Sequence, residues 1–286
     1  MATLGNPQNT IEVLQKYDFH FQKKFGQNFL IDEHVLDKII RAAEITKDDY
    51  VLEIGPGIGT MTQYLACAAR EVTAVELDRA LIPILEDTLK EYDNVSIINE
   101  DILKVDIAAL AKEKNGGRPI KVVANLPYYI TTPIIMGLFE SHVPLESITV
   151  MVQKEAAQRI CAEVGTRQSG AVTVSVNYYA EPEMLFGVSA GSFMPAPKVD
   201  SAVIRLNVRK EPPVTVGNEK LLFNVIKAAF SQRRKTLANS LSSGLSVEKG
   251  KINELLINSG VETNARAEKL TLDDFANITN NLQGMM

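Results

Sequence analysis

Two segments of the chain contain residue types that suit a nucleotide-like cofactor and a reactive amine. The first, Glu53-Ile-Gly-Pro-Gly-Ile-Gly-Thr60, directly follows an apolar stretch and opens a helical pattern. Glycines let the backbone approach a ligand closely, and a helix N-terminus stabilises partial negative charge. The dinucleotide spacing G-x-G-x-x-G would require glycine at position 60, where this chain has Thr60. The segment therefore favours a nucleotide-type cofactor other than a dinucleotide.

The second segment, Asn125-Leu126-Pro127-Tyr128, ends an apolar stretch and suits an exocyclic amine. Such an amine is a poor nucleophile because its lone pair is delocalised into the ring, so a site needs acceptors for its hydrogens. Asn125 offers a side-chain carbonyl, and Pro127 favours an extended Leu126 whose own carbonyl could face the site. Tyr128 could stack on a flipped-out base. The tetrapeptide resembles the N-P-P-Y motif of methyltransferases that act on the exocyclic amine of a base. A plain turn is the alternative, but the position after the glycine segment favours methyl transfer.

Two acidic residues follow the strands predicted between these segments. Glu76 ends the strand 71–76, and Asp101 comes just after the strand 95–98. Glu76 is placed to accept hydrogen bonds from both hydroxyls of a ribose, and Asp101 to accept one from an adenine amine. Each acid alone would more often be a loop residue or a helix cap. Together with the glycine segment, they favour cofactor binding.

Alternating helical and strand patterns from residue 33 onward predict the elements that position these residues. Strands spaced by crossover helices form a parallel, doubly wound sheet with ligand sites at the carboxyl ends of its strands. The predicted strands are 50–54, 71–76, 95–98, 120–125 and 147–153, and the helices are 33–44, 60–69, 79–92, 107–114, 132–141 and 154–162.

After residue 165 the pattern changes to strands at 171–179, 184–189 and 200–208, joined by segments too short for a helix. We expect them to complete the same sheet in antiparallel directions. Beyond a linker at 211–218 only helical patterns remain. The expected fold is therefore α/β, with a Rossmann-like sheet and a small all-α C-terminal domain. The predicted domains are an N-terminal arm at 1–32, a cofactor-binding domain at 33–211 and helices at 212–286.

The composition is that of a globular protein, with 286 residues, 45% hydrophobic and 23% charged. No apolar run is long enough to span a bilayer, and the first residues lack the pattern of a signal peptide, so we expect a cytoplasmic protein without membrane contact. The two cysteines and three histidines show no metal-ligand spacing, which argues against a zinc site and a disulfide framework.

The charge distribution is uneven, although the net charge is −5. Residues 195–240 carry nine lysines and arginines against three acidic residues. Such a basic face is typical of a nucleic-acid footprint, although a solvated helix face is an equal alternative from charge alone.

Six ordered segments resemble the ribosomal RNA adenine dimethyltransferase family, in particular its small-subunit branch of the KsgA/RsmA type. The resemblance implies a class I methyltransferase that uses S-adenosylmethionine to dimethylate two adjacent adenosines in a hairpin loop near the 3′ end of small-subunit ribosomal RNA. It also implies a role in small-subunit biogenesis, with an immature subunit as partner, and we expect a monomer. The segments are KKFGQNFLID (23–32), EIGPGIGTMT (53–62), NLPYYITTPI (125–134), MVQKEAAQRI (151–160), SFMPAPKVDSAVIRL (192–206) and FSQRRKTLANSL (230–241).

The resemblance assigns roles to individual residues. It implies that Asn28 and Leu30 close over the cofactor and that Gly55, in a loop with Gly57, lies beside the methionine part. Glu76 then holds the ribose, Asp101 the adenine, and Asn125 lies near the transferring methyl group. Phe193 would enclose the target adenine opposite Tyr128; core packing is its alternative role, and helix capping is that of Asn28.

The residues expected to bind RNA come from two segments. In the N-terminal arm, Lys23 and Lys24 alternate with aromatic residues, a pattern that suits phosphate contact and stacking, although the aromatics could equally pack on the core. Near the domain junction, Arg233, Arg234 and Lys235 form the densest basic cluster. We expect these five residues to contact phosphates.

Three alternatives stay open at this point. The related large-subunit adenine methyltransferases typically have isoleucine in place of Leu126 and lack the FSQRRKTL pattern. A nicotinamide-dependent oxidoreductase is disfavoured by Thr60 and by the NLPY motif. A non-catalytic ribosome assembly or transcription factor could keep the same fold, although intact Asn125 and Tyr128 argue against it. One departure from the family is Tyr129, where the small-subunit enzymes commonly have asparagine.

Overall fold

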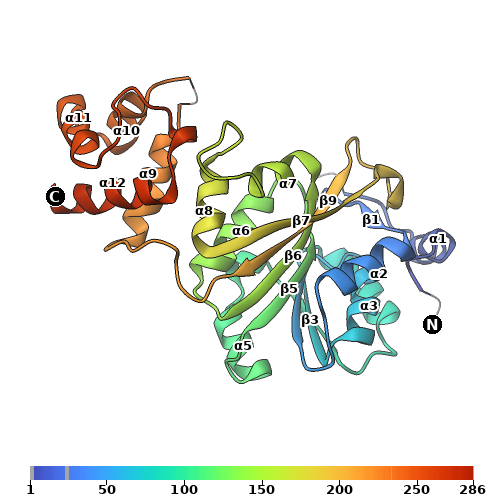
Figure 1. Cartoon of the computed structure of the whole chain (residues 1–286). Coiled ribbons are helices and arrows are strands. Elements are labelled where there is room, and N and C mark those ends of the chain that lie inside the picture. The colour runs from blue at the N-terminus through green and yellow to red at the C-terminus, as the bar shows by residue number, and fades with distance from the viewer. Residues whose placement is uncertain (1–2, 23–25, 233, 286) are drawn as a thin grey trace. The chain divides into compact units, whose positions relative to one another are not determined.

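The computed structural model describes residues 3–22, 26–232 and 234–285. These residues fold into two compact units (Figure 1). The first unit contains the described chain up to Ala157 together with Glu183–Val208. The second contains Gln158–Pro182 and the described chain from Arg209 onward.

A sheet of seven described strands, in the order β4-β3-β2-β5-β6-β9-β7, organises the first unit. Strands β2 to β6 pair in parallel, and β9 runs antiparallel to β6. The predicted α/β class with a mostly parallel sheet is therefore confirmed. The strands are β2 (Tyr50–Ile54), β3 (Glu71–Glu76), β4 (Val95–Asn99), β5 (Ile120–Asn125), β6 (Leu145–Gln153), β7 (Ala180–Val188) and β9 (Ser201–Val208).

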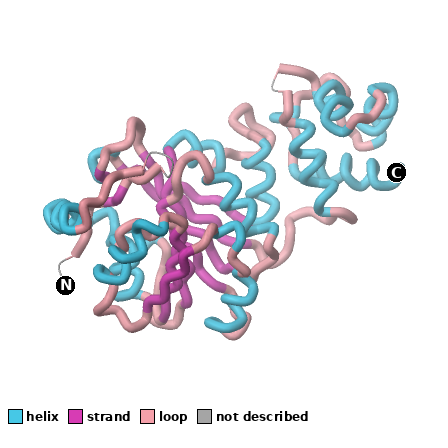
Figure 2. Tube along the Cα trace, turned by 180° about the vertical axis from the view of Figure 1, so that it is seen from behind, coloured by secondary structure: helices cyan, strands magenta, loops and turns pink. Residues whose placement is uncertain are grey.

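Helices cover both faces of this sheet, as Figures 1 and 2 show, with α2 and α3 on one face and α5 and α6 on the other. All five residues of β2 are buried, as expected for a central strand covered on both sides. The helices are α2 (Glu33–Ala42), α3 (Thr60–Ala68), α4 (Ile82–Thr88), α5 (Ile107–Asn115), α6 (Thr131–Glu140) and α7 (Lys154–Ile160), with short 3-10 helices η2 (Arg79–Leu81), η3 (Ile102–Lys104) and η4 (Ala190–Ser192).

The strand order places a ligand crevice between β2 and β5. From β2 the chain crosses over to β3 and β4 on one side, whereas β5 and β6 follow on the other side. At such a reversal the loops after the two central strands diverge, which leaves room at their carboxyl ends. The glycine segment follows β2 and the Asn125 segment ends β5, so both predicted motifs flank this crevice.

The N-terminal arm is tied to the first unit. It contains α1 (Pro7–Lys16) and β1 (Phe29–Leu30), which pairs antiparallel with β8 (Phe193–Met194). Phe29 is buried in a hydrophobic cluster that includes Leu14 and Ile58, with Phe19 packed against it. The arm's described aromatics therefore pack on one another and on the core, the alternative that the sequence left open.

The second unit contains a helix where the sequence predicted a strand. Residues 171–179 form α8 (Ala171–Tyr179), not an antiparallel strand, so that prediction was wrong. The Gly170 N–H donates to the Thr173 hydroxyl at 2.9 Å at the start of the helix. Val174 and Tyr178, one helical turn apart, are buried against the C-terminal helices. Packing thus overrides the strand preference of an alternating β-branched segment.

The core of the second unit joins α8 to the C-terminal helices. Its cluster combines Val174 and Tyr178 with residues such as Leu222, Leu241 and Phe275. Residues 158–182, assigned from the sequence to the cofactor-binding domain, therefore group with the helices because their apolar side chains pack there. These helices are α9 (Glu219–Ala229), α10 (Leu237–Leu245), α11 (Lys249–Asn258) and α12 (Leu272–Met285), with the 3-10 helix η5 (Ala267–Lys269).

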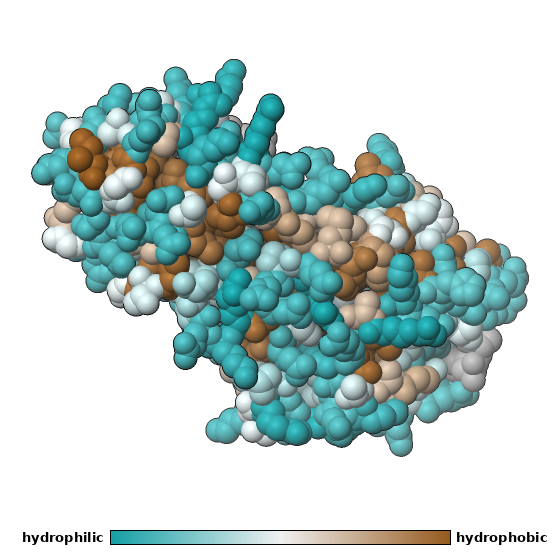
Figure 3. All heavy atoms as spheres, viewed as in Figure 1, coloured by the Kyte–Doolittle hydropathy of each residue, from teal (hydrophilic) through white to brown (hydrophobic). Residues whose placement is uncertain are grey.

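The visible surface is largely polar. On the face shown in Figure 3, hydrophilic residues predominate and hydrophobic ones gather in patches. Among the described helices, none has the length and apolar character needed to cross a membrane.

Candidate active site

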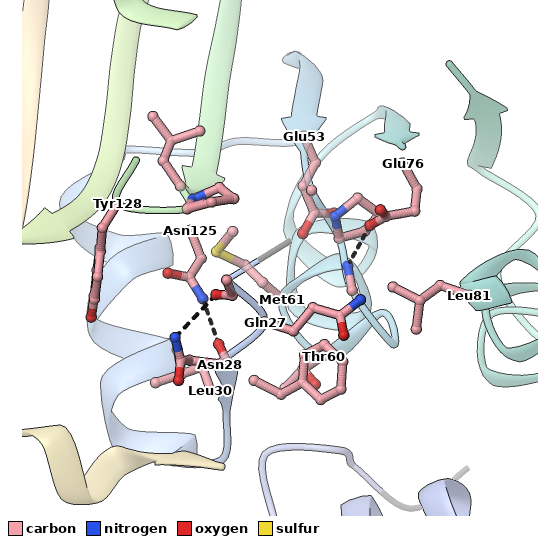
Figure 4. Close-up of a pocket in the computed structure, with 17 residues that line it drawn as sticks. Gln27, Asn28, Leu30, Glu53, Thr60, Met61, Glu76, Leu81, Asn125 and Tyr128 are labelled. Carbon is pink, nitrogen blue, oxygen red and sulfur yellow. Dashed lines mark hydrogen bonds between the residues drawn. The ribbon is translucent and has the colours of Figure 1, made fainter. Parts of the chain in front are cut away.

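A pocket opens at the carboxyl ends of β2 and β5, where the strand order reverses (Figure 4). It brings together the glycine segment, Glu76, the Asn125 segment and the end of the N-terminal arm. Figure 4 shows Tyr128 and Asn125 toward one end of the pocket and Glu76 and Leu81 toward the other. Its lining residues are Gly26, Gln27, Asn28, Phe29, Leu30, Glu53, Gly55, Pro56, Gly57, Thr60, Met61, Glu76, Leu81, Asn125, Leu126, Pro127 and Tyr128.

Gly57 shows why the loop after β2 needs glycine. Its φ is +63°, in the left-handed region that side chains rarely adopt. A Cβ added there would also lie 2.9 Å from a ring carbon of Phe29 in the N-terminal arm. The N–H of Gly57 donates to Glu76 Oε2 at 3.1 Å. The loop therefore fits between an aromatic ring and a carboxylate that it helps to hold.

Both carboxylate oxygens of Glu76 are oriented by the backbone. Oε2 accepts from Gly57, and Oε1 accepts from the N–H of Asp78 at 2.8 Å. Burial raises the pKa of Glu76 to about 7, while these backbone N–H groups oppose the increase. Each oxygen retains a lone pair for a further hydrogen bond, so the carboxylate can accept two hydroxyls of a bound ribose.

Glu53 is a buried carboxyl group at the base of the pocket. Its exposed fraction is 0%, and neither of its oxygens has a hydrogen-bond partner within the described part of the chain. Burial raises the pKa of Glu53 to about 8. Because an unpaired buried carboxylate is costly, this position fits a cationic group of a ligand.

The side chain of Asn125 is held by the N-terminal arm. Its Nδ2 donates to the main-chain oxygen of Asn28 at 3.1 Å, and the Asn28 side chain in turn donates to the Gly26 oxygen at 3.0 Å. In this orientation Oδ1 of Asn125 accepts no hydrogen bond from any residue that the structure describes. The carbonyl is thus available to accept an N–H of a substrate amine.

The remaining residues of the NLPY segment also line the pocket. The hydroxyl of Tyr128 lies 2.9 Å from that of Ser201 at the start of β9, which fixes the position of the ring. The N–H of Leu126 donates to the Met151 oxygen at 3.1 Å on the neighbouring strand β6, and the Pro127 oxygen accepts from Ile130 at the same distance. The segment is therefore anchored on both sides, as a rigid base-binding wall requires.

Asp101 lies away from this pocket lining. It is partly exposed, and its Oδ1 accepts from the N–H of Leu103 at 3.0 Å at the start of η3. Two leucines beside the predicted adenine contacts are unusually exposed, Leu77 at 50% and Leu103 at 48%. The adenine role of Asp101 stays a prediction, and these leucines are apolar surface that the sequence analysis did not consider.

Phe193 is packed in the core. Its exposed fraction is 4%, and it belongs to a cluster with Leu30 and Leu36, where β8 pairs Phe193 opposite Leu30. The alternative of core packing is thus the one seen here. Tyr128, in contrast, lines the pocket, so the proposed enclosure of a base between the two rings stays a prediction.

The predicted RNA-binding residues fall into two groups. Lys23, Lys24 and Arg233 lie outside the described residues. Arg234 and Lys235 are exposed between α9 and α10 in the second unit. Both are therefore accessible to a polyanion.

Two other cations of the basic segment are engaged within the protein. Arg205 pairs with Glu44 at 2.6 Å and Glu183 at 3.2 Å, and Arg209 pairs with Glu181 at 2.7 Å. The positive charge available to a partner is therefore smaller than the composition of residues 195–240 indicates.

The pocket contains side chains that the sequence analysis did not assign to the site. They are Gln27, Phe29, Pro56, Thr60, Met61 and Leu81. Glu53, which the sequence analysis placed at the start of the glycine segment, also lines the pocket. Nothing in the sequence around Thr60 predicts that its hydroxyl is buried without a partner among the described residues. Within the described ranges, histidine, cysteine and acidic side chains form no group of three or more suited to a metal ion.

The chain is similar to known proteins over most of its length. Residues 18–284 match the family model described as ribosomal RNA adenine dimethylase. The chain is 64% identical over 281 residues to a protein of Lachnoclostridium phytofermentans named ribosomal RNA small subunit methyltransferase A, with 97% of each chain covered.

Two solved structures are also similar. One is a dimethyladenosine transferase from Plasmodium falciparum, with a TM-score of 0.71, 26% identity and coverage of 87% of this chain and 95% of the other. The second is the 23S ribosomal RNA methyltransferase ErmE, with a TM-score of 0.66, 28% identity and coverage of 90% and 100%.

Proposed function

The chain belongs to the ribosomal RNA adenine dimethylase family, and from this premise we infer that it dimethylates adenosine amines in small-subunit (16S) ribosomal RNA with S-adenosylmethionine. The observation that carries this inference is the shared pocket of Asn125, Tyr128, Gly57 and Glu76. An amide that can accept from an amine lies in one pocket with a carboxylate that can hold a ribose. The enzyme class is therefore an S-adenosylmethionine-dependent rRNA adenine dimethyltransferase.

The pocket residues fit the cofactor. S-adenosylmethionine supplies a methyl group on a positively charged sulfur and carries an ammonium group and a ribose. Glu53 is a buried, unpaired carboxyl that would hold the cationic part, and Glu76 would accept the ribose hydroxyls. Beside Gly55, an added Cβ would meet no described atom within 4 Å, so the backbone leaves room for the methionine part.

The acceptor end of the pocket handles the amine. Asn125 Oδ1 would accept one N–H of the target adenine, and the Leu126 carbonyl the other, which favours a pyramidal nitrogen with an available lone pair. Tyr128, fixed by Ser201, would stack on the flipped base. A strong general base is unnecessary because the methylated ammonium is acidic enough to lose its proton to water.

Small-subunit RNA is the substrate that the relatives favour. The relative named for the small subunit is 64% identical to this chain, whereas the large-subunit enzyme ErmE is 28% identical. The large-subunit alternative is therefore not favoured, nor is a non-catalytic factor, because Asn125, Tyr128 and Glu76 are all present. We further propose that the targets are two adjacent adenosines near the 3′ end of that RNA. The substrate is an immature small subunit, and the enzyme acts as a monomer.

The proposal is tested by methyl transfer from radiolabelled S-adenosylmethionine to undermethylated small subunits, naked small-subunit RNA and large subunits. We expect label in dimethyladenosine on the undermethylated small subunits, less on naked small-subunit RNA and none on the large subunit. Label on the large subunit would make the ErmE-type alternative correct. Cofactor binding without transfer to any of the three would support the non-catalytic factor.

A further inference from the structure

Asp78, a residue outside the pocket lining, makes more contacts than a helix cap needs. Its exposed fraction is 5%. Its Oδ1 accepts from the N–H of Ala80 at 3.1 Å, which caps η2. Its Oδ2 accepts from Gln27 Nε2 at 2.7 Å and from Gln22 Nε2 at 3.2 Å. The carboxylate therefore joins the loop after β3 to the N-terminal arm, across 51 residues of sequence.

On the arm side, the contact continues to the methyl acceptor site. Gln27 Oε1 accepts from the N–H of Gln22 at 2.8 Å while its Nε2 donates to Asp78, so the amide can be oriented in one way only. The next residue is Asn28, whose main-chain oxygen accepts from Asn125 Nδ2. The Gln27 side chain therefore anchors the arm to Asp78 at the residue next to the one whose main-chain oxygen holds Asn125.

On the loop side, the contact continues to the cofactor site. The N–H of Asp78 donates to Glu76 Oε1 at 2.8 Å. Because the Asp78 side chain is held by Ala80 and the two glutamines, its backbone N–H is held as well. The direction in which Glu76 presents its oxygens thus depends on the same residue.

We propose that Asp78 is a positioning residue that couples the ribose carboxylate Glu76 to the acceptor amide Asn125, by linking both to Gln27. The coupling rests on the proposed function for its catalytic consequence, but the hydrogen-bond chain exists without cofactor or RNA. A cap alone would need one carboxylate oxygen. The second oxygen, buried and occupied by glutamine amides, is what the capping role leaves unexplained.

The hydrogen bond between Asp78 and Gln27 can be tested by swapping the carboxylate and the amide between the two positions. In Asp78→Asn the amide oxygen can still cap Ala80, but its NH₂ group then faces the NH₂ groups of both Gln27 and Gln22. In Gln27→Glu, two carboxylates face each other. In the double variant, the new NH₂ group at position 78 can donate to the new carboxylate at position 27, whose other oxygen still accepts from the Gln22 N–H. Gln22 Nε2 keeps the oxygen at the Oδ1 position of residue 78 as an acceptor, from which it lies 3.4 Å in the wild type. Because the double variant restores the hydrogen bond that each single variant breaks, recovery shows that residues 78 and 27 act together. Destabilisation alone would add up in the double variant.

We expect each single variant to weaken S-adenosylmethionine binding, measured by calorimetry, by about 10-fold and to reduce kcat on small subunits by a similar factor. The double variant should recover both values to within about 3-fold of the wild type. In the cofactor-free protein, amide hydrogen exchange at Asn28–Leu30 should accelerate in the single variants and slow again in the double variant.

The matched control is Asp106→Asn. Asp106 caps α5 through Ala109 at 2.9 Å but has no hydrogen bond to the described part of the arm, so this variant should keep wild-type binding, turnover and exchange. The proposal is overturned if Asp78→Asn behaves like Asp106→Asn, or if the double variant shows the combined losses of both single variants. If the proposed function is wrong, the wild type will show no methyl transfer. Amide hydrogen exchange at Asn28–Leu30 in the cofactor-free variants will then still test the hydrogen bonds of Asp78.

Discussion

Asn125 and Asn28, which are 97 positions apart, are joined by a hydrogen bond of 3.1 Å from the side chain of the first to the main-chain oxygen of the second. This bond uses the NH₂ group of Asn125 inside the protein and leaves the carbonyl for the substrate. In the proposed function, the arm would therefore contribute through its backbone as well as through the Asn28 and Leu30 side chains expected to close over the cofactor. The separate location of Glu76 means that cofactor binding and turnover should respond to different substitutions.

We expect Asn125→Ala to reduce kcat by about 10²- to 10³-fold with little change in S-adenosylmethionine affinity, because it removes the acceptor for the reacting amine. Glu76→Ala should instead weaken cofactor binding by about 10- to 100-fold, because two charge-assisted hydrogen bonds to ribose are lost. Calorimetry and single-turnover methyl transfer at saturating cofactor measure the two effects. Equal affinity losses, with turnover intact in both variants, would contradict these roles.

Gly57→Ala should lower both stability and cofactor affinity. The left-handed φ costs about 1–2 kcal/mol for alanine, and the new methyl group would displace the Phe29 ring. Gly116 is the matched control, with φ +61° and no described atom within 4 Å of an added Cβ. Urea unfolding should show a larger loss for Gly57→Ala than for Gly116→Ala; equal losses would mean that the contact with Phe29 is unimportant.

Much of the sheet could be predicted from the sequence because its strands are buried on both faces. The strands expected at 50–54, 71–76 and 120–125 have these bounds in the structure. Short, mostly apolar segments that end at or just before a glycine, an acidic residue or an asparagine mark both the strand and its functional end. The positions of Glu76 and Asn125 at one crevice follow directly from that pattern.

Other features depend on contacts between distant segments, which leave no local pattern. The helix α8 was predicted as a strand because its apolar residues alternate, but Val174 and Tyr178 pack on the C-terminal helices. The burial of Phe193 follows from its pairing with Leu30 in a two-stranded sheet. The hydrogen bond from Asn125 to Asn28 likewise required the folded arm.

The two buried carboxyl groups predict how stability depends on pH. Burial raises the pKa of Glu53 to about 8 and that of Glu76 to about 7, from a value of 4.5 in the absence of burial. Between pH 4.5 and the folded-state pKa of each group, the unfolded chain has released a proton that the folded chain still holds. Both groups therefore make the cofactor-free protein less stable as pH rises. Their contribution is fully present below about pH 4.5 and is lost as pH rises through the folded-state pKa values.

Glu53→Gln should therefore reduce the loss of stability between pH 5.5 and 8. We expect the wild type to lose at least about 1 kcal/mol more than this variant over that range in urea unfolding. Comparing the two proteins cancels titrations that they share. Parallel curves would show that Glu53 is already ionised in the folded protein.

Finally, if Arg234 and Lys235 contact phosphates, replacing both with glutamine should weaken RNA binding and reduce its salt dependence. Log affinity falls linearly with log salt, and each lost contact reduces the magnitude of that negative slope by about 0.7 to 0.9. Cofactor affinity should stay unchanged, because neither residue lines the cofactor pocket. As a control, Lys249 and Lys251 on the exposed side of α11 are both replaced with glutamine, which removes the same amount of positive charge. Filter binding to small-subunit RNA from about 50 to 200 mM salt measures the slope. If the two double variants change it equally, the effect comes from net charge alone, and the claim of specific phosphate contacts at Arg234 and Lys235 fails.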